Sequence, residues 1–235
     1  MTNSPIKIVE GIELFDKGAG IAKVCVTEPN GWENLSWDRY VRLKAAAAAV
    51  EKAEGKRVLD AGGYDGAIAF FLPGMEIDVI DPETTGGSVL QIEAADNSYD
   101  TVVAVDVLEH VAPVDRAKAL CEFARVTGKH VILNYPCTDS KEAQALALKL
   151  TNNPLIRDHV QWELPDSEWV LAELAKYGFI GTVVPHTSIA IWLSQYVTLN
   201  LVPDAARELN FHLVENYAEE PFTRALYHLV VCSRK

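Results

Sequence analysis

Short apolar runs alternate with segments of helical apolar spacing along most of this chain. Strand-like runs lie at residues 57–61, 76–81, 99–108, 130–136 and 179–184, and helical segments begin near residues 36, 113, 139 and 166. The helical segments carry their own end signals, since a Pro opens one and Gly residues follow several others. A strand–helix rhythm of this kind predicts a doubly wound α/β fold, a mostly parallel sheet with helices on both faces.

The end of the chain departs from this rhythm. Two helical stretches, 189–201 and 203–217, follow each other without a strand between them, and a β-rich segment, RALYHLVVCS, closes the sequence. No internal repeat or low-complexity linker divides the chain. We therefore expect one domain over 1–235, with a helical N-terminal segment at 1–54 and a helical insertion at 186–222 before the last strand.

Composition and charge narrow the classes of function. Hydrophobic residues make up 49% and charged residues 23% of the 235 residues, and the formal net charge is −12. An acidic surface repels phosphate backbones, so we expect no nucleic-acid partner. The start lacks the basic head and apolar core of a signal peptide, and the longest weakly polar stretch, TVVAVDVL, is too short to span a bilayer. We therefore expect a cytoplasmic protein without a membrane partner.

Cysteines and histidines give no sequence signal for a metal. The chain has no CxxC pair and no His at zinc-ligand spacing beside its widely separated cysteines, Cys25, Cys121, Cys137 and Cys232. We expect reduced, mostly buried thiols and no metal site.

The stretch RVLDAGGYDGAIAF, residues 57–70, places a strand before a glycine-rich turn. A dinucleotide turn needs glycines at its first, third and sixth positions. Counted from Gly62, those later positions hold Tyr64 and Ala67. Counted from Gly63, they hold Asp65 and Ile68. The pattern of a nicotinamide-dependent oxidoreductase therefore fails in both registers.

VLDAGGYDG instead resembles the first motif of the class I S-adenosylmethionine-dependent methyltransferases. The stretch ADNSYDTVVAVDVLEHV, residues 95–111, closely resembles the fourth-strand signature of that family, and DVIDPE places Asp81 at the end of a second strand. The resemblance covers about residues 35–185. It implies a seven-stranded sheet with an antiparallel last strand, S-adenosyl-L-methionine as cofactor, and a segment 1–54 that acts as an N-terminal lid. The cofactor-binding residues that it implies are Asp60, Gly62, Gly63, Tyr64, Gly66, Asp81, Pro82, Ser88, Val89, Asp106 and Val107.

Two positions depart from the family pattern. Tyr64 stands where many members have glycine. We expect its backbone to keep a negative φ and its ring to cover the cofactor, the alternative being a strained left-handed conformation. Ser88 stands where many relatives have an adenine-contacting Asp, so its hydroxyl and the Val89 N–H are the adenine contacts that we expect.

The resemblance implies an enzyme that transfers a methyl group. His110, within the fourth-strand signature, and His159, before a later helix, are the candidates for a general base or a substrate contact, because imidazole titrates near neutrality. We expect a small-molecule acceptor such as a sugar, a lipid precursor or a secondary metabolite. The alternative is a methyltransferase-like binding protein without turnover. A homodimer is left open.

Overall fold

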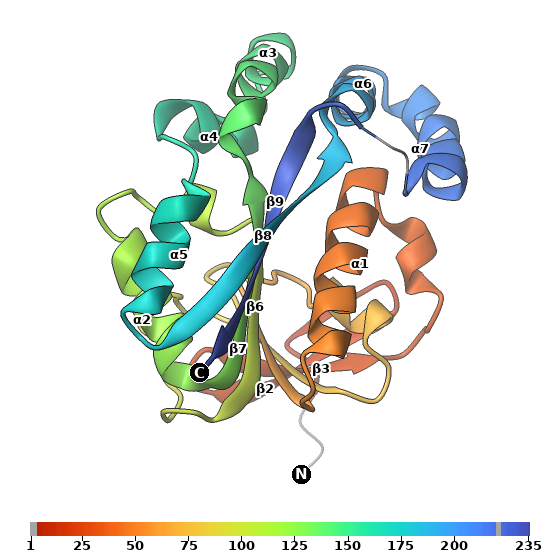
Figure 1. Cartoon of the computed structure of the whole chain (residues 1–235). Helices are drawn as coiled ribbons and strands as arrows, with labels where there is room; N and C mark the ends of the chain where they lie inside the picture. Colours follow the sequence, from red (N-terminus) through yellow and green to blue (C-terminus); the bar gives the residue numbers. More distant parts are fainter. Residues whose placement is uncertain (1–3, 220–221) are drawn as a thin grey trace.

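The computed structural model describes residues 4–219 and 222–235, and within these ranges nine strands form one mixed sheet (Figure 1). The strands lie side by side in the order β1-β2-β3-β5-β4-β6-β7-β9-β8. Their bounds are β1 (Lys7–Val9), β2 (Ile12–Gly18), β3 (Ile21–Val26), β4 (Arg57–Ala61), β5 (Glu76–Ile80), β6 (Tyr99–Val105), β7 (Thr127–Pro136), β8 (Phe179–Ser188) and β9 (Ala225–Arg234).

The centre of the sheet has the predicted parallel arrangement. Strand β4 pairs in parallel with β5 and β6, and β6 pairs in parallel with β7. The last strand, β9, lies antiparallel between β7 and β8. The doubly wound α/β class and the antiparallel last strand are therefore confirmed.

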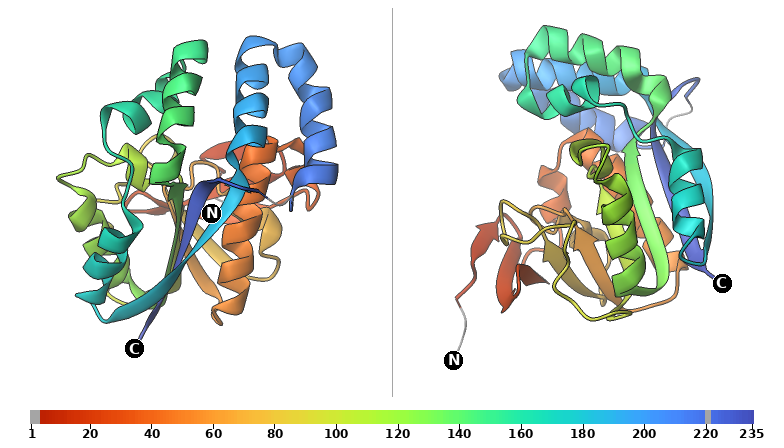
Figure 2. Two further views of the ribbon diagram at one scale, coloured as in Figure 1. Left: turned by 45° about the horizontal axis from the view of Figure 1, so that its top comes forward. Right: turned by 90° about the vertical axis from the view of Figure 1, so that its left-hand side faces the viewer.

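The predicted count of seven strands is wrong, and the difference lies at the N-terminal edge. Residues 88–91 form only one isolated bridge, and the antiparallel strand β3 takes the place beside β5. Strands β1 and β2 continue the sheet beyond it, as the red strands in Figure 2 show. In β2, buried Ile12 and Leu14 flank the half-exposed Glu13, and two glycines with positive φ surround the turn into β3.

The predicted helical character of segment 1–54 therefore holds only for its later part. Residues 7–26 are strands, and residues 1–3 lie outside the described ranges. The described helical part consists of η1 (Gly31–Asn34) and α1 (Trp37–Lys52). The alternation of apolar and polar side chains around a glycine turn is the hairpin pattern that overrides the expectation of a helical lid.

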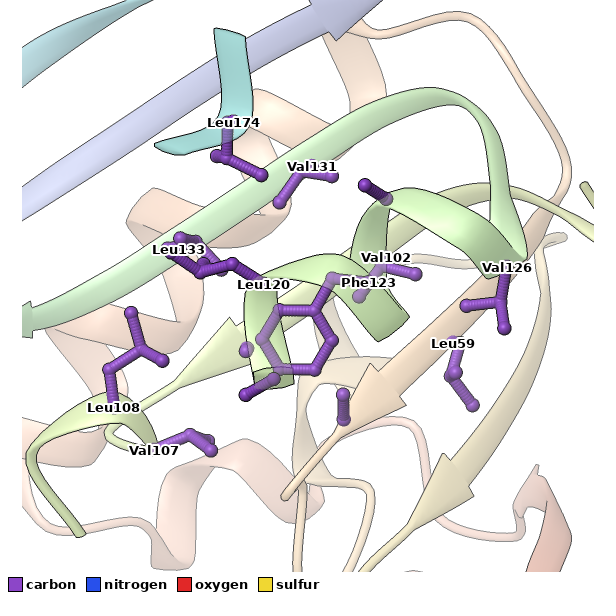
Figure 3. Close-up of a cluster of buried hydrophobic side chains, with 14 of the residues drawn as sticks. Leu59, Val102, Val107, Leu108, Leu120, Phe123, Val126, Val131, Leu133 and Leu174 are labelled. Atoms are coloured by element: carbon purple, nitrogen blue, oxygen red, sulfur yellow. The ribbon is translucent and has the colours of Figure 1, made fainter. Parts of the chain in front are cut away.

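Helices cover both faces of the sheet. Helix α1 and η2 (Ala67–Phe71) pack on one face, and α2 (Arg116–Val126) and α5 (Ser167–Ala175) pack on the other (Figure 1). On the second face, Leu120 and Phe123 of α2 lie against Val102, Val131 and Leu133 of the sheet and Leu174 of α5 (Figure 3). These side chains form a dry core that fixes the ends of β6 and β7.

A helical cap lies above the carboxyl ends of the parallel strands. Figure 1 shows it at the top, and its members are α3 (Lys141–Thr151), α4 (Arg157–Gln161), α6 (Ile189–Leu201) and α7 (Pro203–Tyr217). The short helices η3 (Leu108–His110), η4 (Thr138–Ser140) and η5 (Pro154–Ile156) lie in the loops beneath or within it. The predicted helical insertion at 186–222 thus contains two helices, α6 and α7, and residues 220–221 lie outside the described ranges.

The cap is joined to the sheet by its own apolar cluster. Trp37 and Val41 of α1 pack with Trp192 and Tyr196 of α6 and with Tyr227 of β9. Since α1, α6 and β9 all contribute to one cluster, the cap and the sheet form a continuous core. None of the described helices combines the length and the apolar character needed to cross a bilayer.

Candidate functional site

A cavity of about 770 Å³ lies between the carboxyl ends of the central strands and the helical cap. Its floor is formed by the loops after β4, β5 and β6, and its walls come from α1, α3, α4, α6 and β9. All of the predicted site residues line it except Gly66 and Ser88; the ones that do are Asp60, Gly62, Gly63, Tyr64, Asp81, Pro82, Val89, Asp106, Val107, His110 and His159. The carboxyl ends of parallel strands are where open α/β sheets bind ligands.

Glycine at position 62 is required by both conformation and space. Gly62 has a φ of +80°, and a Cβ there would lie 2.5 Å from Cγ2 of Val107. Its N–H donates to the carbonyl oxygen of Ile80 at 2.7 Å, which ties the loop after β4 to the end of β5. At Gly63 a Cβ would collide with the carboxylate of Asp60. The loop therefore brings bare backbone to the floor of the cavity.

Tyr64 does not adopt the expected backbone conformation. Its φ is +51°, in the left-handed region, so the expectation of a negative φ is wrong. The Tyr64 carbonyl oxygen accepts a hydrogen bond from Thr84 Oγ1 at 2.6 Å, which holds the loop after β4 against the loop after β5. Tyr64 lines the cavity and is 45% exposed. The neighbouring loop thus holds Tyr64 in a left-handed conformation that glycine adopts more readily.

Asp60, at the end of β4, is a buried carboxyl group aimed at the cavity. It is 1% exposed, and among the described residues neither of its oxygens has a hydrogen-bond partner. Burial raises the pKa of Asp60 to about 8, and the nearby Asp65 adds to the rise while Arg39 opposes it. An unpartnered acceptor at this depth is available to a donor group on a ligand.

Asp81, at the end of β5, uses one of its two carboxylate oxygens to build its own turn. Oδ1 accepts from the N–H groups of Glu83 at 2.9 Å and Thr84 at 3.1 Å. The hydrogen bonds found for this side chain all go to Oδ1, so Oδ2 remains for a ligand hydroxyl. The N-terminal hairpin supports this loop, because Thr85 Oγ1 donates to the carbonyl oxygen of Gly20 at 2.6 Å.

Asp106, directly after β6, forms the centre of a charged cluster. Its φ is +56°, and its Oδ2 lies 3.1 Å from Arg42 Nη1, while Oδ1 is buried without a partner in the described structure. The same guanidinium nitrogen contacts Asp38 Oδ2 at 3.0 Å and the Tyr227 hydroxyl at 3.2 Å. Burial raises the pKa of Asp106, opposed by Arg42 and His110. Burial lowers the pKa of Arg42, but its acidic neighbours outweigh that effect, so the guanidinium stays charged.

The two predicted catalytic histidines lie in contact. Nε2 of His110 is 3.2 Å from Nε2 of His159, although the residues are 49 positions apart in the sequence. Nδ1 of His110 lies 3.2 Å from Asp158 Oδ2, and Nδ1 of His159 lies 3.1 Å from Gln144 Oε1. Burial lowers the pKa of His159 to about 3, with His110 and Arg42 contributing, so this ring is neutral at neutral pH.

Glu109 lies next to this pair and was not selected from the sequence. It is 0% exposed, and both of its carboxylate oxygens lack a hydrogen-bond partner in the described parts of the chain. Burial raises the pKa of Glu109 well above its usual range, and Asp106 adds to the rise. The sequence did contain a signal for Glu109, because it lies in the DVLEHV stretch, and Asp106 and His110 of that stretch were predicted site residues.

Two predicted cofactor residues lie outside the cavity lining. Gly66 has a φ of +73°, and a Cβ there would meet the side chain of Val24 on β3, so this glycine serves the packing of the turn against the hairpin. Ser88 is exposed, and its Oγ accepts from the Leu90 N–H at 3.2 Å. Of the two expected adenine contacts, the structure thus brings only Val89 to the cavity.

The remaining wall of the cavity consists mostly of residues that were not among the predicted site residues. Trp192 and Tyr196 come from α6, Tyr227 from β9, Gln144 from α3 and Arg42 from α1. They are separated along the chain and belong to no motif. Trp192 and Tyr196 belong to the insertion, and Tyr227 belongs to the last strand.

The cavity fits S-adenosylmethionine in size and in chemistry. Its volume lies within the usual range of small-molecule sites, roughly 300–1,000 Å³. The cofactor carries an ammonium group, a sulfonium and ribose hydroxyls, and the floor offers free acceptor oxygens on Asp60, Asp81 and Asp106. The glycine loop provides backbone that can approach the ligand without a Cβ.

Comparisons with known proteins agree with this assignment. Residues 75–133 match a family model described as a methyltransferase domain. No curated protein matches the chain in a sequence search. Similar solved structures include a candidate sarcosine dimethylglycine methyltransferase from Galdieria sulphuraria, at 15% identity and a TM-score of 0.53, covering 83% of this chain and 84% of that one.

Two further structures have the same fold. A candidate methyltransferase from an antibiotic biosynthesis pathway of Anabaena variabilis is 11% identical, with a TM-score of 0.54 over 83% of this chain and 99% of that one. A structure of a Haloferax volcanii candidate methyltransferase with the Trm112 activator gives 14% identity and a TM-score of 0.50, covering 88% of this chain and 93% of that one. At these identities the likeness shows the fold.

Proposed function

We propose that this chain, a class I S-adenosylmethionine-dependent methyltransferase by its fold and by its methyltransferase-domain sequence, methylates a small molecule held under the helical cap. The observation that carries the proposal is that one cavity contains both halves of such a site. The strand-end carboxylates and the glycine loop lie on its floor, and aromatic and imidazole side chains lie on its wall.

The floor supplies the contacts for the cofactor. S-adenosylmethionine, when bound, supplies an electrophilic methyl group on a sulfonium. Asp60 and Asp106 offer buried acceptor oxygens to donor groups, and Asp81 offers Oδ2 to a ribose hydroxyl. Gly62 and Gly63 have no Cβ atoms, so the ligand can approach the backbone of this loop closely. The protein thus mainly orients the reactants and excludes water.

The wall supplies the contacts for the acceptor. Trp192 and Tyr196 present neighbouring rings, with centroids 5.2 Å apart, and Tyr227 lies on the same wall. The Tyr196 hydroxyl is buried without a partner in the described structure, and burial raises its pKa to about 12, so it stays a neutral donor. Such a wall suits an acceptor with a flat or apolar part and one polar group.

The size and charge of the site favour a small molecule over a macromolecule. The acceptor side is walled by α3, α4 and α6, and the chain carries a net charge of −12. Among the acceptor classes expected from the sequence, the aromatic wall favours a lipid precursor or a secondary metabolite over a free sugar. His110 and His159 are polar groups on the same wall.

A binding protein without turnover is the second candidate. It is favoured by the exposed position of Ser88, which leaves the expected adenine contact unmade. Both candidates bind the cofactor, so binding alone does not separate them, whereas methyl transfer does.

The test combines calorimetry with a labelled methyl donor. We expect S-adenosylhomocysteine to bind with a micromolar Kd, about −8 kcal/mol, and NAD not to bind. Incubation with S-adenosylmethionine carrying a labelled methyl group should label at least one member of a panel of aromatic and lipid-like acceptors. Binding without labelling across the panel would favour the binding protein, and absence of binding would overturn both candidates.

A matched pair of variants tests the acceptor wall. Tyr196→Phe removes only the unpartnered hydroxyl and should raise the acceptor KM about tenfold at unchanged affinity for S-adenosylhomocysteine, because the acceptor loses one hydrogen bond. Tyr217→Phe, on α7 and outside the cavity lining, is the control and should leave both values unchanged. Equal KM values in the two variants would remove Tyr196 from the acceptor site.

A further inference from the structure

Three side chains beside the acceptor wall are arranged as metal ligands. Glu109 and His110 lie on η3 and His159 lies on α4, and one potential ligand atom from each is within 4.8 Å of the others. The helices η3 and α4 contact each other, which brings together residues from separate parts of the chain. The cluster has the composition of a two-histidine, one-carboxylate site.

The hydrogen bonds of the two rings leave their Nε2 lone pairs facing each other. The carbonyl oxygen of Gln144 can only accept, so Nδ1 of His159 carries the proton and its Nε2 carries a lone pair. The carboxylate of Asp158 favours a proton on Nδ1 of His110 in the same way. Two lone pairs 3.2 Å apart repel each other unless a proton or a cation lies between them.

The spacing of the nitrogens fits a shared cation. With metal–nitrogen distances of about 2.05 Å, an N···N separation of 3.2 Å corresponds to an angle of about 100° at the metal, close to tetrahedral. The outer contacts fit as well, since metal-bound histidines usually donate their other N–H to a carboxylate or a carbonyl. Asp158 and Gln144 provide those two acceptors.

Glu109 supplies the independent argument for positive charge at this place. It is fully buried and has no hydrogen-bond donor among the described residues. A buried carboxyl group without donors either keeps its proton or needs a cation to balance its charge. The Nε–H of Arg116 donates to the backbone carbonyls of Leu108 and Val111, so Arg116 and Arg42 act on Glu109 through their charge without a hydrogen bond to it.

We propose that Glu109, His110 and His159 bind one divalent cation of the zinc type. Imidazole nitrogens favour zinc and its transition-metal neighbours over magnesium and calcium, which prefer all-oxygen sites. His110 and His159 line the cavity and Glu109 does not, so the open side of the cation faces the acceptor. The sequence analysis predicted no metal site because it looked for ligands close together in the chain, and His110 and His159 are 49 residues apart.

The proposed cation changes the role of the two histidines. With both Nε2 atoms occupied, neither ring takes a proton from the acceptor, and the cation instead presents a vacant position to an acceptor oxygen or a water. The inference goes beyond methyl transfer, and its test reads the cation directly.

The experiment uses Co²⁺ and Zn²⁺ as the added cations. The full chain is treated with a chelator, dialysed and titrated with Co²⁺, whose visible absorption reports ligand type and geometry. We expect one Co²⁺ per chain with low-coordinate nitrogen and oxygen ligation, displaced stoichiometrically by Zn²⁺. His159→Ala and Glu109→Gln should each lower the affinity at least a hundredfold. Asp158→Asn should lower it about tenfold, because that residue only orients a ligand.

His130→Ala is the matched control. His130 contacts Ser233 on the sheet, outside the cavity lining, so the affinity for Co²⁺ should not change. Circular dichroism checks the fold of each variant, and His110→Ala replaces any variant that fails to fold. Three results would overturn the proposal: no saturable binding, affinities equal to wild type in the His159 and Glu109 variants, or a thiolate charge-transfer band that places the cation on a cysteine.

Discussion

The two sides of the cavity are built in different ways. The cofactor side comes from three loops that each follow a central parallel strand, and its groups lie within a few residues of a motif. The acceptor side gathers single side chains from α1, α3, α4, α6 and β9. The first is held by backbone geometry and the second by packing and paired charges between elements distant in the sequence.

This difference predicts how each side responds to mutation. On the cofactor side, changes in backbone conformation should reduce ligand binding and leave the fold intact. On the acceptor side, loss of one charged partner should destabilise the fold, because the same side chains join α1 to the sheet. The variants below test that division, from the largest expected effect to the smallest.

Arg42→Met should destabilise the protein by about 3 kcal/mol. The guanidinium contacts Asp38, Asp106 and Tyr227, and its removal leaves the buried Asp38 and the half-buried Asp106 without their cation. The Arg42 side chain is 15% exposed, so the expected loss lies at the lower end of the roughly 3–5 kcal/mol that breaking a buried ion pair costs. Urea unfolding measures it. Arg57→Met, at a half-exposed pair 3.7 Å from Asp100, is the control and should cost less than about 1 kcal/mol. Equal losses would refute the division.

Gly62→Ala should weaken S-adenosylhomocysteine binding about a hundredfold, or about 2.7 kcal/mol. The new Cβ meets Val107 at 2.5 Å in a backbone with a φ of +80°, so the loop must move. Gly74→Ala is the control, because Gly74 has a φ of +81° and no atom within 4 Å of its Cβ position. That variant should lose about 1 kcal/mol of stability and keep its affinity. If calorimetry finds the same affinity for S-adenosylhomocysteine in both variants, the contact between position 62 and Val107 has no effect on ligand binding.

Binding of the cofactor should release a proton near neutral pH. Asp60 has its pKa raised to about 8 by burial, so it is protonated at pH 7 in the free protein, and the cationic ligand favours the ionised form. Affinity should therefore rise with pH by up to tenfold per unit and level off above pH 8. Without ligand the sign is the opposite: the stability from protonated Asp60 is full at acid pH and is lost as the pH rises through 8. Calorimetry in buffers of different ionisation enthalpy counts the proton, and Asp60→Asn should abolish its release. Release unchanged in that variant would assign the proton to another group.

Asp81→Asn should weaken S-adenosylhomocysteine binding about tenfold, or about 1.4 kcal/mol. The amide keeps Oδ1 as the acceptor for Glu83 and Thr84, so the turn survives, and only the group at Oδ2 changes. The melting temperature should stay within the error of wild type. Glu76→Gln, exposed at the opposite end of β5, controls for loss of charge. A normal affinity in Asp81→Asn would show that this acid only builds its own turn.

Tyr64→Gly should have the smallest effect. Glycine removes the backbone strain of the left-handed Tyr64, which stabilises the fold by about 1–2 kcal/mol. The higher entropy of glycine in the unfolded chain offsets part of this gain, so the free energy of unfolding should rise by about 0.5 kcal/mol. The lost ring should weaken cofactor binding two- to fivefold. Glu54→Gly, at another exposed left-handed position outside the cavity, should match the change in stability and leave the affinity unchanged. Tighter binding in Tyr64→Gly would show that the ring does not contribute to the site.

The sequence predicted those parts whose determinants are local. The ends of β4, β5 and β6, the glycine loop and the helices α6 and α7 follow from apolar runs, glycines and capping signals within each segment. His110 and His159 were selected separately. Their contact could not be predicted, because it depends on η3 and α4 meeting in space.

The misses share one physical cause, which is competition between distant segments for the same place. An N-terminal strand, β3, occupies the position beside β5, and the sequence did not predict a strand in that segment. Tyr64 keeps its left-handed conformation while Thr84, from another loop, bonds its carbonyl oxygen. Arg42 gains its partners only when α1 packs on β9 and on the loop after β6, and Tyr196 reaches the cavity only when α6 packs on α1 and β9.

The antiparallel pairing of β3 with β5 affects how the protein folds during translation. Ile21 pairs with Ile80, so the hairpin emerges first but must wait for about 60 further residues, roughly 3–12 s of translation at ordinary rates. During that interval the nascent β2–β3 ribbon has no sheet to join. Gly20, at its tip, then accepts the hydrogen bond from Thr85 that supports the Asp81 turn. The hairpin thus docks only after β5 has emerged, and its arrival completes the floor of the cofactor site.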